Sequence, residues 1–194
     1  MSANPMDVPE SWPVLSSEVV FSEWVIDVRK DVITRPEGGE SFSRLVVDHP
    51  GAAIVFALDD EFRVLVLRQY RHGVQHRMVQ LPAGVIDGAG EDPLDVAQRE
   101  LREEAQFAAA SWTPMLDYFV SPGITNERYS LFLARDLTPV DRGDFELQHE
   151  EIDLVPEWIR FVDLLDDVVS GRVRDGALIN AVLAYNVMSR RGQL

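Results

Sequence analysis

The sequence predicts a mixed α/β (α+β) fold with a small antiparallel sheet at its N-terminal end, and three observations lead to this prediction. Val- and Ile-rich segments alternate between residues 17 and 50, and a Pro-Glu-Gly-Gly turn at 36–39 interrupts them. Two dense apolar runs follow at 52–58 and 64–67, with an acidic turn between them, as in a hairpin of buried strands. A segment with clear helical periodicity then completes the mixed composition of elements.

That segment begins after residue 92 and is the clearest helix in the chain. Asp92 is a favourable N-cap, and Pro93 suits the first helical position. An apolar stripe recurs at helical spacing through Leu94, Ala97, Leu101 and Ala105. A glycine-rich loop at 82–90 separates this helix from the strand before it.

The remaining elements follow from shorter patterns. Strands are expected at 77–81, 115–120, 129–134 and 158–162, helices at 163–169 and 175–190, and an acidic flexible loop at 141–153.

Composition excludes several classes of protein. The 194 residues fit one domain with a modest appendage, and 18 Lys and Arg against 33 Asp and Glu give a formal net charge of −15. That charge repels nucleic acid and anionic membrane surfaces, so neither is an expected partner. No apolar stretch reaches the roughly 20 residues of a membrane span. With no cysteine and no visible secretory signal, the expected compartment is the cytoplasm.

Three carboxylates crowd one edge of the predicted helix. At about 100° per residue, Glu100, Glu103 and Glu104 fall within roughly 100° of one another, beside the apolar stripe. Like charges this close repel unless a cation neutralises them, and hard oxygen ligands select Mg²⁺, Mn²⁺ or Ca²⁺. The alternative is a solvated acidic helix face, and the glutamate pair alone does not decide between the two.

The context of these glutamates favours the metal site. Gly84 opens a loop that leads to Glu91, and the segment 99–107 reads Arg-Glu-Leu-Arg-Glu-Glu-Ala-Gln-Phe. This arrangement resembles the Nudix box, in which Gly and Glu precede Arg-Glu-apolar-x-Glu-Glu-x-Gly-apolar. The chain departs from the box twice: six residues instead of five separate Gly84 from Glu91, and Gln106 stands in place of Gly.

The resemblance implies an α/β/α sandwich with a mixed central sheet, and it implies metal ligands. Glu100 and Glu104 would be the principal ligands of Mg²⁺, or of Mn²⁺, and Glu103 would add a ligand directly or through water. The backbone carbonyl of Ala83 would coordinate as well. Arg99 would orient Glu103, although an ordinary surface salt bridge is the alternative for this arginine.

A general base is expected outside the box. The resemblance points to the acidic loop, where Glu151 or Glu150 would activate the attacking water, and Glu151 could also bind metal. Glu151 is preferred over Glu150, although the sequence does not fix the choice, and a solvated charge run is the alternative for both.

Further motifs resemble the ADP-ribose pyrophosphatase branch of the family. They are Arg68-Gln69-Tyr70-Arg71, Leu81-Pro82-Ala83-Gly84 and Ser121-Pro122-Gly123. In this branch the substrate is a nucleotide sugar, which implies phosphate binding by Arg71 and a substrate contact near Gly123. It also implies a homodimer through the N-terminal sheet, from which Trp24 and Arg44 would reach the partner's site.

The expected organisation is an N-terminal extension at 1–16, a dimerising sheet at 17–50 and a catalytic domain at 51–194. The leading hypothesis is metal-dependent hydrolysis of ADP-ribose, or of a related nucleoside-diphosphate sugar, to AMP and a sugar phosphate. Two alternatives are a family member that acts on dinucleoside polyphosphates, NADH or nucleoside triphosphates, and a non-catalytic sensor that binds a nucleotide. The preferred substrate and the number of metal ions stay open.

Overall fold

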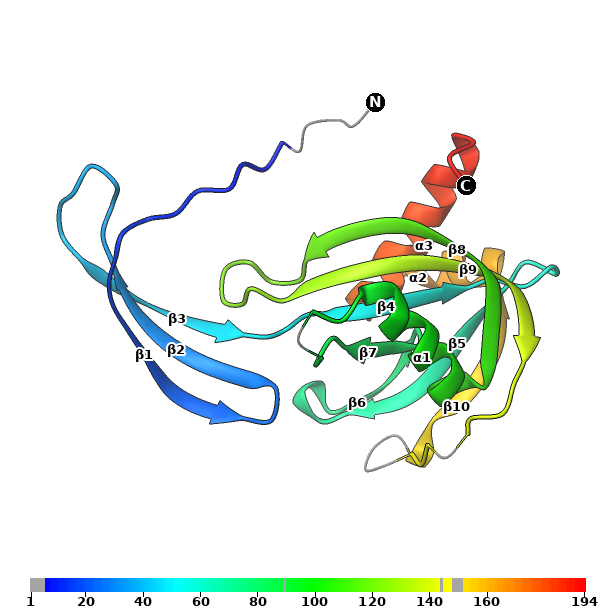
Figure 1. The fold of residues 1–194 in the computed structure, drawn as a ribbon. Coiled ribbons are helices and arrows are strands. Elements are labelled where there is room, and N and C mark those ends of the chain that lie inside the picture. The colour runs from blue at the N-terminus through cyan, green and yellow to red at the C-terminus, as the bar shows by residue number, and fades with distance from the viewer. Residues whose placement is uncertain (1–5, 89, 144, 148–151) are drawn as a thin grey trace. The chain divides into compact units, whose positions relative to one another are not determined.

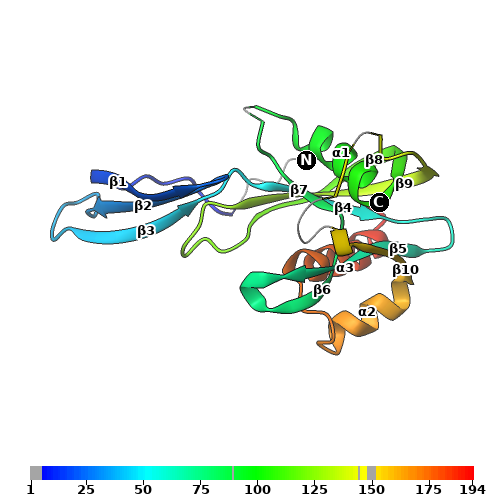
Figure 2. The same ribbon diagram turned by 90° about the horizontal axis from the view of Figure 1, so that it is seen from below.

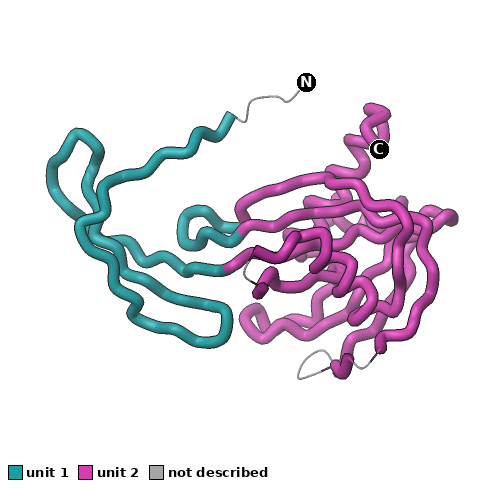
Figure 3. Tube along the Cα trace, viewed as in Figure 1, with its two compact units in different colours: residues 1–49, 120–127 teal, residues 50–119, 128–194 magenta. Residues whose placement is uncertain are grey.

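The computed structural model describes residues 6–88, 90–143, 145–147 and 152–194, and the chain forms two compact units (Figures 1 and 3). Unit 1 contains the described residues up to His49 together with Val120–Glu127. Unit 2 contains Pro50–Phe119 and Arg128–Leu194. The first unit boundary lies between His49 and Pro50, and segment 120–127 groups with the N-terminal unit.

Unit 1 is a three-stranded antiparallel sheet, as the sequence predicts for residues 17–50. Its order is β1-β2-β3, formed by Val14–Glu23, Ile26–Ile33 and Phe42–Asp48. Segment 120–127 joins the sheet at β3, where the N–H of Val47 donates to the carbonyl of Ile124 at 2.8 Å. The loop with the Ser-Pro-Gly motif therefore folds together with the N-terminal strands.

Unit 2 contains two sheets. A mixed sheet has the order β7-β4-β9-β8, in which β4 and β9 run parallel and the other neighbours antiparallel. An antiparallel sheet has the order β10-β5-β6. The strands are β4 Ala52–Ala57, β5 Arg63–Arg71, β6 His76–Gln80, β7 Ala83–Val85, β8 Phe107–Phe119, β9 Arg128–Pro139 and β10 Val155–Arg160, with a short 3₁₀ turn η1 at His72–Val74.

The predicted hairpin of buried strands is wrong in its pairing. Both apolar runs form strands, but β4 and β5 belong to different sheets, and the chain between them is joined by the bridge of Leu58 with Val64. A dense apolar run indicates a strand that is buried on both faces, yet it does not specify which strand lies beside it. The strands expected at 115–120 and 129–134 are also longer than predicted.

The helices begin and end close to the predicted residues. Helix α1 is Pro93–Ala105, α2 is Phe161–Val169 and α3 is Gly176–Arg190. The Asp92 side chain accepts a hydrogen bond from the N–H of Leu94 at 2.9 Å, which confirms the predicted N-cap. Asp175 caps α3 in the same way, through the N–H of Leu178 at 2.8 Å.

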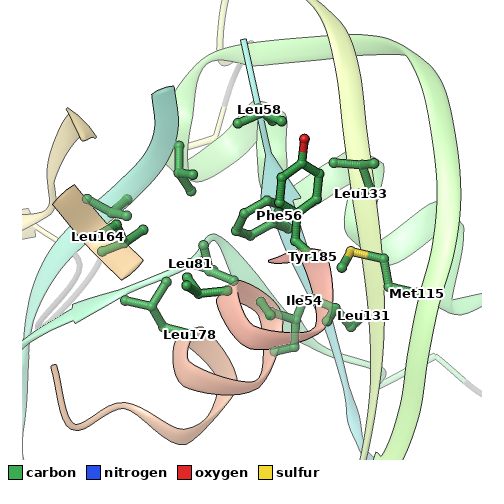
Figure 4. Close-up of a cluster of buried hydrophobic side chains, with 14 of the residues drawn as sticks. Ile54, Phe56, Leu58, Leu81, Met115, Leu131, Leu133, Leu164, Leu178 and Tyr185 are labelled. Carbon is green, nitrogen blue, oxygen red and sulfur yellow. The ribbon is translucent and has the colours of Figure 1, made fainter. Parts of the chain in front are cut away.

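Strand β4 lies at the centre of unit 2 and is buried throughout. Ala53, Val55 and Ala57 pack with α1, whereas Ile54 and Phe56 pack with α2 and α3 on the opposite face (Figures 2 and 4). Alternate side chains of a strand point to opposite faces, so one strand separates two apolar layers. This arrangement is the predicted α/β/α sandwich.

In the described part of the chain, no helix is both long enough and apolar enough to cross a membrane.

Gln106 ends α1 in the left-handed conformation, with φ 61° and ψ 40°. Its N–H donates to the carbonyl of Arg102 at 3.0 Å, as a glycine at this position would. The helix end therefore keeps the geometry of the glycine in the Nudix-box pattern, although a side chain with a Cβ is disfavoured in this conformation.

We expect Gln106→Gly to stabilise the protein by about 1 kcal/mol, because it removes the steric cost of a Cβ at positive φ. The free energy of unfolding in urea, measured by circular dichroism, checks this. Gln106→Ala is the matched control, since it shortens the side chain but keeps the Cβ. If the glycine variant is no more stable than the alanine variant, the cap is not strained.

Candidate metal and substrate site

Glu104 is the buried carboxylate of the site. Helix α1 packs against β4 and β7, and only 6% of Glu104 is exposed. Its Oε2 accepts a hydrogen bond from the backbone N–H of Ala83, the first residue of β7, at 2.9 Å. A buried carboxylate is costly unless hydrogen bonds or a cation compensate the lost hydration, so this contact stabilises the charge at the strand.

Glu100, one turn earlier on α1, approaches the next residue of the same strand. A Cβ placed on Gly84 would collide with Oε1, Cδ and Cγ of Glu100. The carboxylate of Glu100 therefore occupies the space that any other side chain at position 84 would fill. The first glycine of the box pattern is required here for clearance, and it lets Glu100 and Glu104 meet the same strand.

Arg99 lies beside Glu100. Its Nη1 is 3.6 Å from Oε1 of Glu100, and its Nη2 is 3.6 Å from Oε1 of Glu91, which lies in the loop before the helix. The Nε and Nη2 atoms are buried without a hydrogen-bond partner among the described residues. The ion pairs seen at Arg99 thus connect it to Glu91 and Glu100, and its expected action on Glu103 stays a prediction.

The donor set fits a divalent cation. Two glutamates approach one strand, Glu103 is half-buried on the same helix, and these carboxylate oxygens are the hard ligands that Mg²⁺ and Mn²⁺ prefer. As the side chains stand, no three Asp, Glu or His residues in the described ranges are grouped closely enough to hold a metal ion. At Ala83 the observed contact uses the N–H, so metal binding by its carbonyl stays a prediction.

The predicted general bases, Glu150 and Glu151, lie outside the described residues. The beginning of their acidic segment is described and is held against the end of α1. There the Nε of Arg102 donates to the carbonyl of Asp141 at 2.9 Å. The helix that carries the metal-ligand candidates is therefore bonded directly to the segment that leads to the candidate bases.

Arg71 ends β5 and is exposed. Its Nε donates to Oε1 of Gln80 at 2.6 Å, across the β5–β6 pair. Gln80 ends β6, three residues before Ala83. This hydrogen bond links Arg71 to the chain segment that leads into β7.

The other substrate-binding candidates belong to unit 1. Trp24 is 82% exposed in the β1–β2 turn and has a positive φ of 55°, which is rare for a bulky residue. The guanidinium of Arg44 lies 4.4 Å from the ring centroid of Phe42. Gly123 is exposed in segment 120–127. A hollow of about 580 Å³ in unit 1 is lined by Trp12, Ile33, Arg35, Phe42 and Arg44.

Sequence reasoning missed the contacts of three residues near the site. Gly84 was predicted as the first glycine of the box pattern, in a loop at 82–90, but its clearance for Glu100 depends on how α1 packs against β7. Arg102 and Gln80 had no predicted role. Their only signal in the sequence is their position next to predicted site residues, because their partners are distant along the chain.

The chain is similar to known proteins in sequence and in fold. The family model of the NUDIX domain matches residues 48–175. An ADP-ribose pyrophosphatase of Mycobacterium tuberculosis is 35% identical over 90% of this chain and 83% of its own length. One of Bacillus subtilis is 33% identical over 87% of this chain and 89% of its own. A crystal structure of an ADP compounds hydrolase superposes with a TM-score of 0.76 at 20% identity, covering 97% of this chain and all of that one, which confirms the fold.

We expect Gly84→Ala to weaken binding of Mn²⁺ by at least about tenfold, because the new Cβ displaces the Glu100 carboxylate. Calorimetric titration with Mn²⁺ measures this, and thermal unfolding of the apoprotein checks that the fold is retained. Gly176→Ala is the matched control, since a Cβ there meets nothing within 4 Å. Equal Mn²⁺ affinity in the Gly84→Ala and unaltered proteins would remove Glu100 from the metal site.

Proposed function

Because the chain belongs to the Nudix hydrolase family, we propose that it hydrolyses the diphosphate linkage of ADP-ribose or of a related nucleoside-diphosphate sugar. The products would be AMP and a sugar phosphate, and the cofactor Mg²⁺ or Mn²⁺. Support for this substrate class comes from the two ADP-ribose pyrophosphatases, which are similar to this chain over most of its length. The cytoplasm is the compartment that we propose, in keeping with a cysteine-free composition.

The observation that carries the proposal is the convergence of two glutamates on one short strand. Glu104 is bonded to Ala83, and Glu100 fills the space above Gly84. The two residues lie one turn apart on α1, so both carboxylates could be ligands of one cation. Such a site can hold a phosphate-bearing substrate in spite of the net charge of −15, because the cation reverses the local field.

Bound divalent cations neutralise the diphosphate oxygens and lower the pKa of a coordinated water. The residues of the chain would supply the remaining functions. Arg99, half-buried beside Glu100 and Glu91, would hold the Glu100 carboxylate in orientation. Arg71 would bind the substrate phosphates, and Glu151 or Glu150 would accept the proton of the attacking water.

The predicted homodimer would use the face of unit 1. Every residue of β1 is exposed, including Val19, Val20 and Phe21, which are each at least half exposed. Exposed apolar side chains on a ten-residue edge strand are unfavourable in water and favour burial against another chain. A second copy of this chain is the occupant that we propose, and the exposed Trp24 and Arg44 of one subunit would then reach the substrate of the other.

We expect sedimentation equilibrium to give twice the 21.9 kDa of one chain, and Phe21→Glu to lower this mass toward that of the monomer, because a buried charge weakens an apolar interface. Val162→Glu is the control, since Val162 is similarly exposed but lies on α2 in unit 2. A monomer at all protein concentrations contradicts the proposal.

The function itself is tested with purified protein, Mg²⁺ or Mn²⁺ and a panel of ADP-ribose, other nucleoside-diphosphate sugars, dinucleoside polyphosphates, NADH and nucleoside triphosphates. We expect release of AMP from ADP-ribose, and we expect Glu104→Gln to lower turnover by at least about tenfold. The glutamine can still accept the Ala83 hydrogen bond, so thermal unfolding should change little.

Glu61→Gln removes the same charge from an exposed turn and is the matched control. Inertness toward every nucleoside-diphosphate sugar contradicts the proposed substrate class. Unchanged turnover in Glu104→Gln, with an active unaltered protein, contradicts the metal-ligand role.

A further inference from the structure

Three side chains in unit 2 form a continuous line of hydrogen bonds. The Nε of Arg71 donates to Oε1 of Gln80 at 2.6 Å, and the Nε2 of Gln80 donates to Oδ2 of Asp175 at 2.7 Å. The other carboxylate oxygen of Asp175 accepts the N–H of Leu178 in the cap of α3 at 2.8 Å. The line thus runs from an exposed strand end to a helix whose cap fixes the aspartate.

The chemistry of the two ends determines the orientation of the Gln80 amide. A guanidinium can only donate and an ionised carboxylate can only accept, so the amide must turn its oxygen to Arg71 and its nitrogen to Asp175. Glutamate at position 80 could accept from Arg71 but could not donate to Asp175. Glutamine can therefore bond both Arg71 and Asp175. Because its side chain is neutral, this hydrogen bond does not neutralise the positive charge of Arg71.

We propose that Gln80 and Asp175 are positioning residues for Arg71 and present its two Nη groups to the substrate diphosphate; this inference rests on the proposed function. With Nε occupied by Gln80, the remaining donors are the two Nη groups, and none of their contacts to the described chain is a hydrogen bond or ion pair. These two groups form the end-on fork that binds two phosphate oxygens at once.

The position of the line supports this assignment. Gln80 pairs with Leu67 in the β5–β6 ladder and is three residues from Ala83, whose N–H holds Glu104. Arg71 is exposed and has a long, flexible side chain, so an unanchored guanidinium would lose rotamer entropy each time it bound a phosphate. The anchored form has lost part of that freedom before the substrate arrives, which lowers the cost of binding.

We expect Gln80→Met, which keeps the length of the side chain but removes both hydrogen bonds, to raise KM for ADP-ribose about tenfold while kcat changes much less. The double variant Arg71→Met, Gln80→Met is decisive, because Gln80→Met should have no further effect on KM once Arg71 is absent. Arg63→Met removes a cation from the other end of β5, where the guanidinium pairs with Asp59, and is the control with unchanged KM. Independent, multiplying effects of Arg71→Met and Gln80→Met on KM would overturn the proposal.

Asp175→Asn separates positioning from folding. Asparagine is as good an N-cap as aspartate, so α3 and the thermal unfolding temperature should be unchanged. Asparagine has one acceptor oxygen in place of two, so it cannot accept from Leu178 and from Gln80 at separate oxygens. If the Gln80 amide turns its oxygen to accept from the asparagine NH₂ group, that oxygen no longer accepts from Arg71. KM should rise as in Gln80→Met, and an unchanged KM would overturn the proposal.

The Nε–H of Arg71 gives a readout that needs no activity. In ¹⁵N NMR spectra of the full chain, we expect its exchange with water to be slow in the unaltered protein and at least about tenfold faster in Gln80→Met and Asp175→Asn. Equal exchange rates in all three proteins would contradict the hydrogen bonds from Arg71 through Gln80 to Asp175. If the protein hydrolyses none of the panel substrates but shows the expected exchange rates, the proposed function and the substrate role of Arg71 are contradicted. The positioning of Arg71 by Gln80 and Asp175 would still be supported.

Discussion

The burial of one carboxylate constrains the whole candidate site. Glu104 lies almost completely within unit 2, on the edge of the apolar layer that α1 forms with β4, and its Oε2 accepts a hydrogen bond from the backbone N–H of Ala83 at the start of β7. A buried carboxylate needs hydrogen bonds or a cation to compensate the lost hydration, and the strand supplies one such hydrogen bond. The packing of α1 therefore decides where a cation can bind.

The neighbouring strand has a complementary requirement. Gly84 has no side chain, and the Glu100 carboxylate occupies the space that a side chain at position 84 would fill. This allows Glu100 to reach the strand. Arg99 adds a positive charge between Glu100 and Glu91, at the edge where the loop joins the helix. Helix, strand and loop are thus fixed to one another by the same few groups that would bind metal, which couples the stability of this region to its chemistry.

The insertion in the box and the residue at its end have different consequences. The six-residue spacing from Gly84 to Glu91 lengthens the loop, yet α1 still begins at a capped Pro93 and brings its glutamates to β7. Gln106 adopts the left-handed conformation that the pattern assigns to glycine. The helix end is therefore kept at some steric cost, and neither departure moves Glu100 or Glu104 away from the strand.

The sequence by itself determined the elements whose signals are local. The cap at Asp92, the apolar stripe of α1, the antiparallel sheet of unit 1 and the spacing of the box glutamates all depend on residues within a few positions of one another. Only the tertiary structure decided the pairing of β4 and β5 with different sheets, the clearance at Gly84 and the line from Arg71 through Gln80 to Asp175. These features join residues that are far apart in the chain, and a side chain carries no local mark of a distant partner.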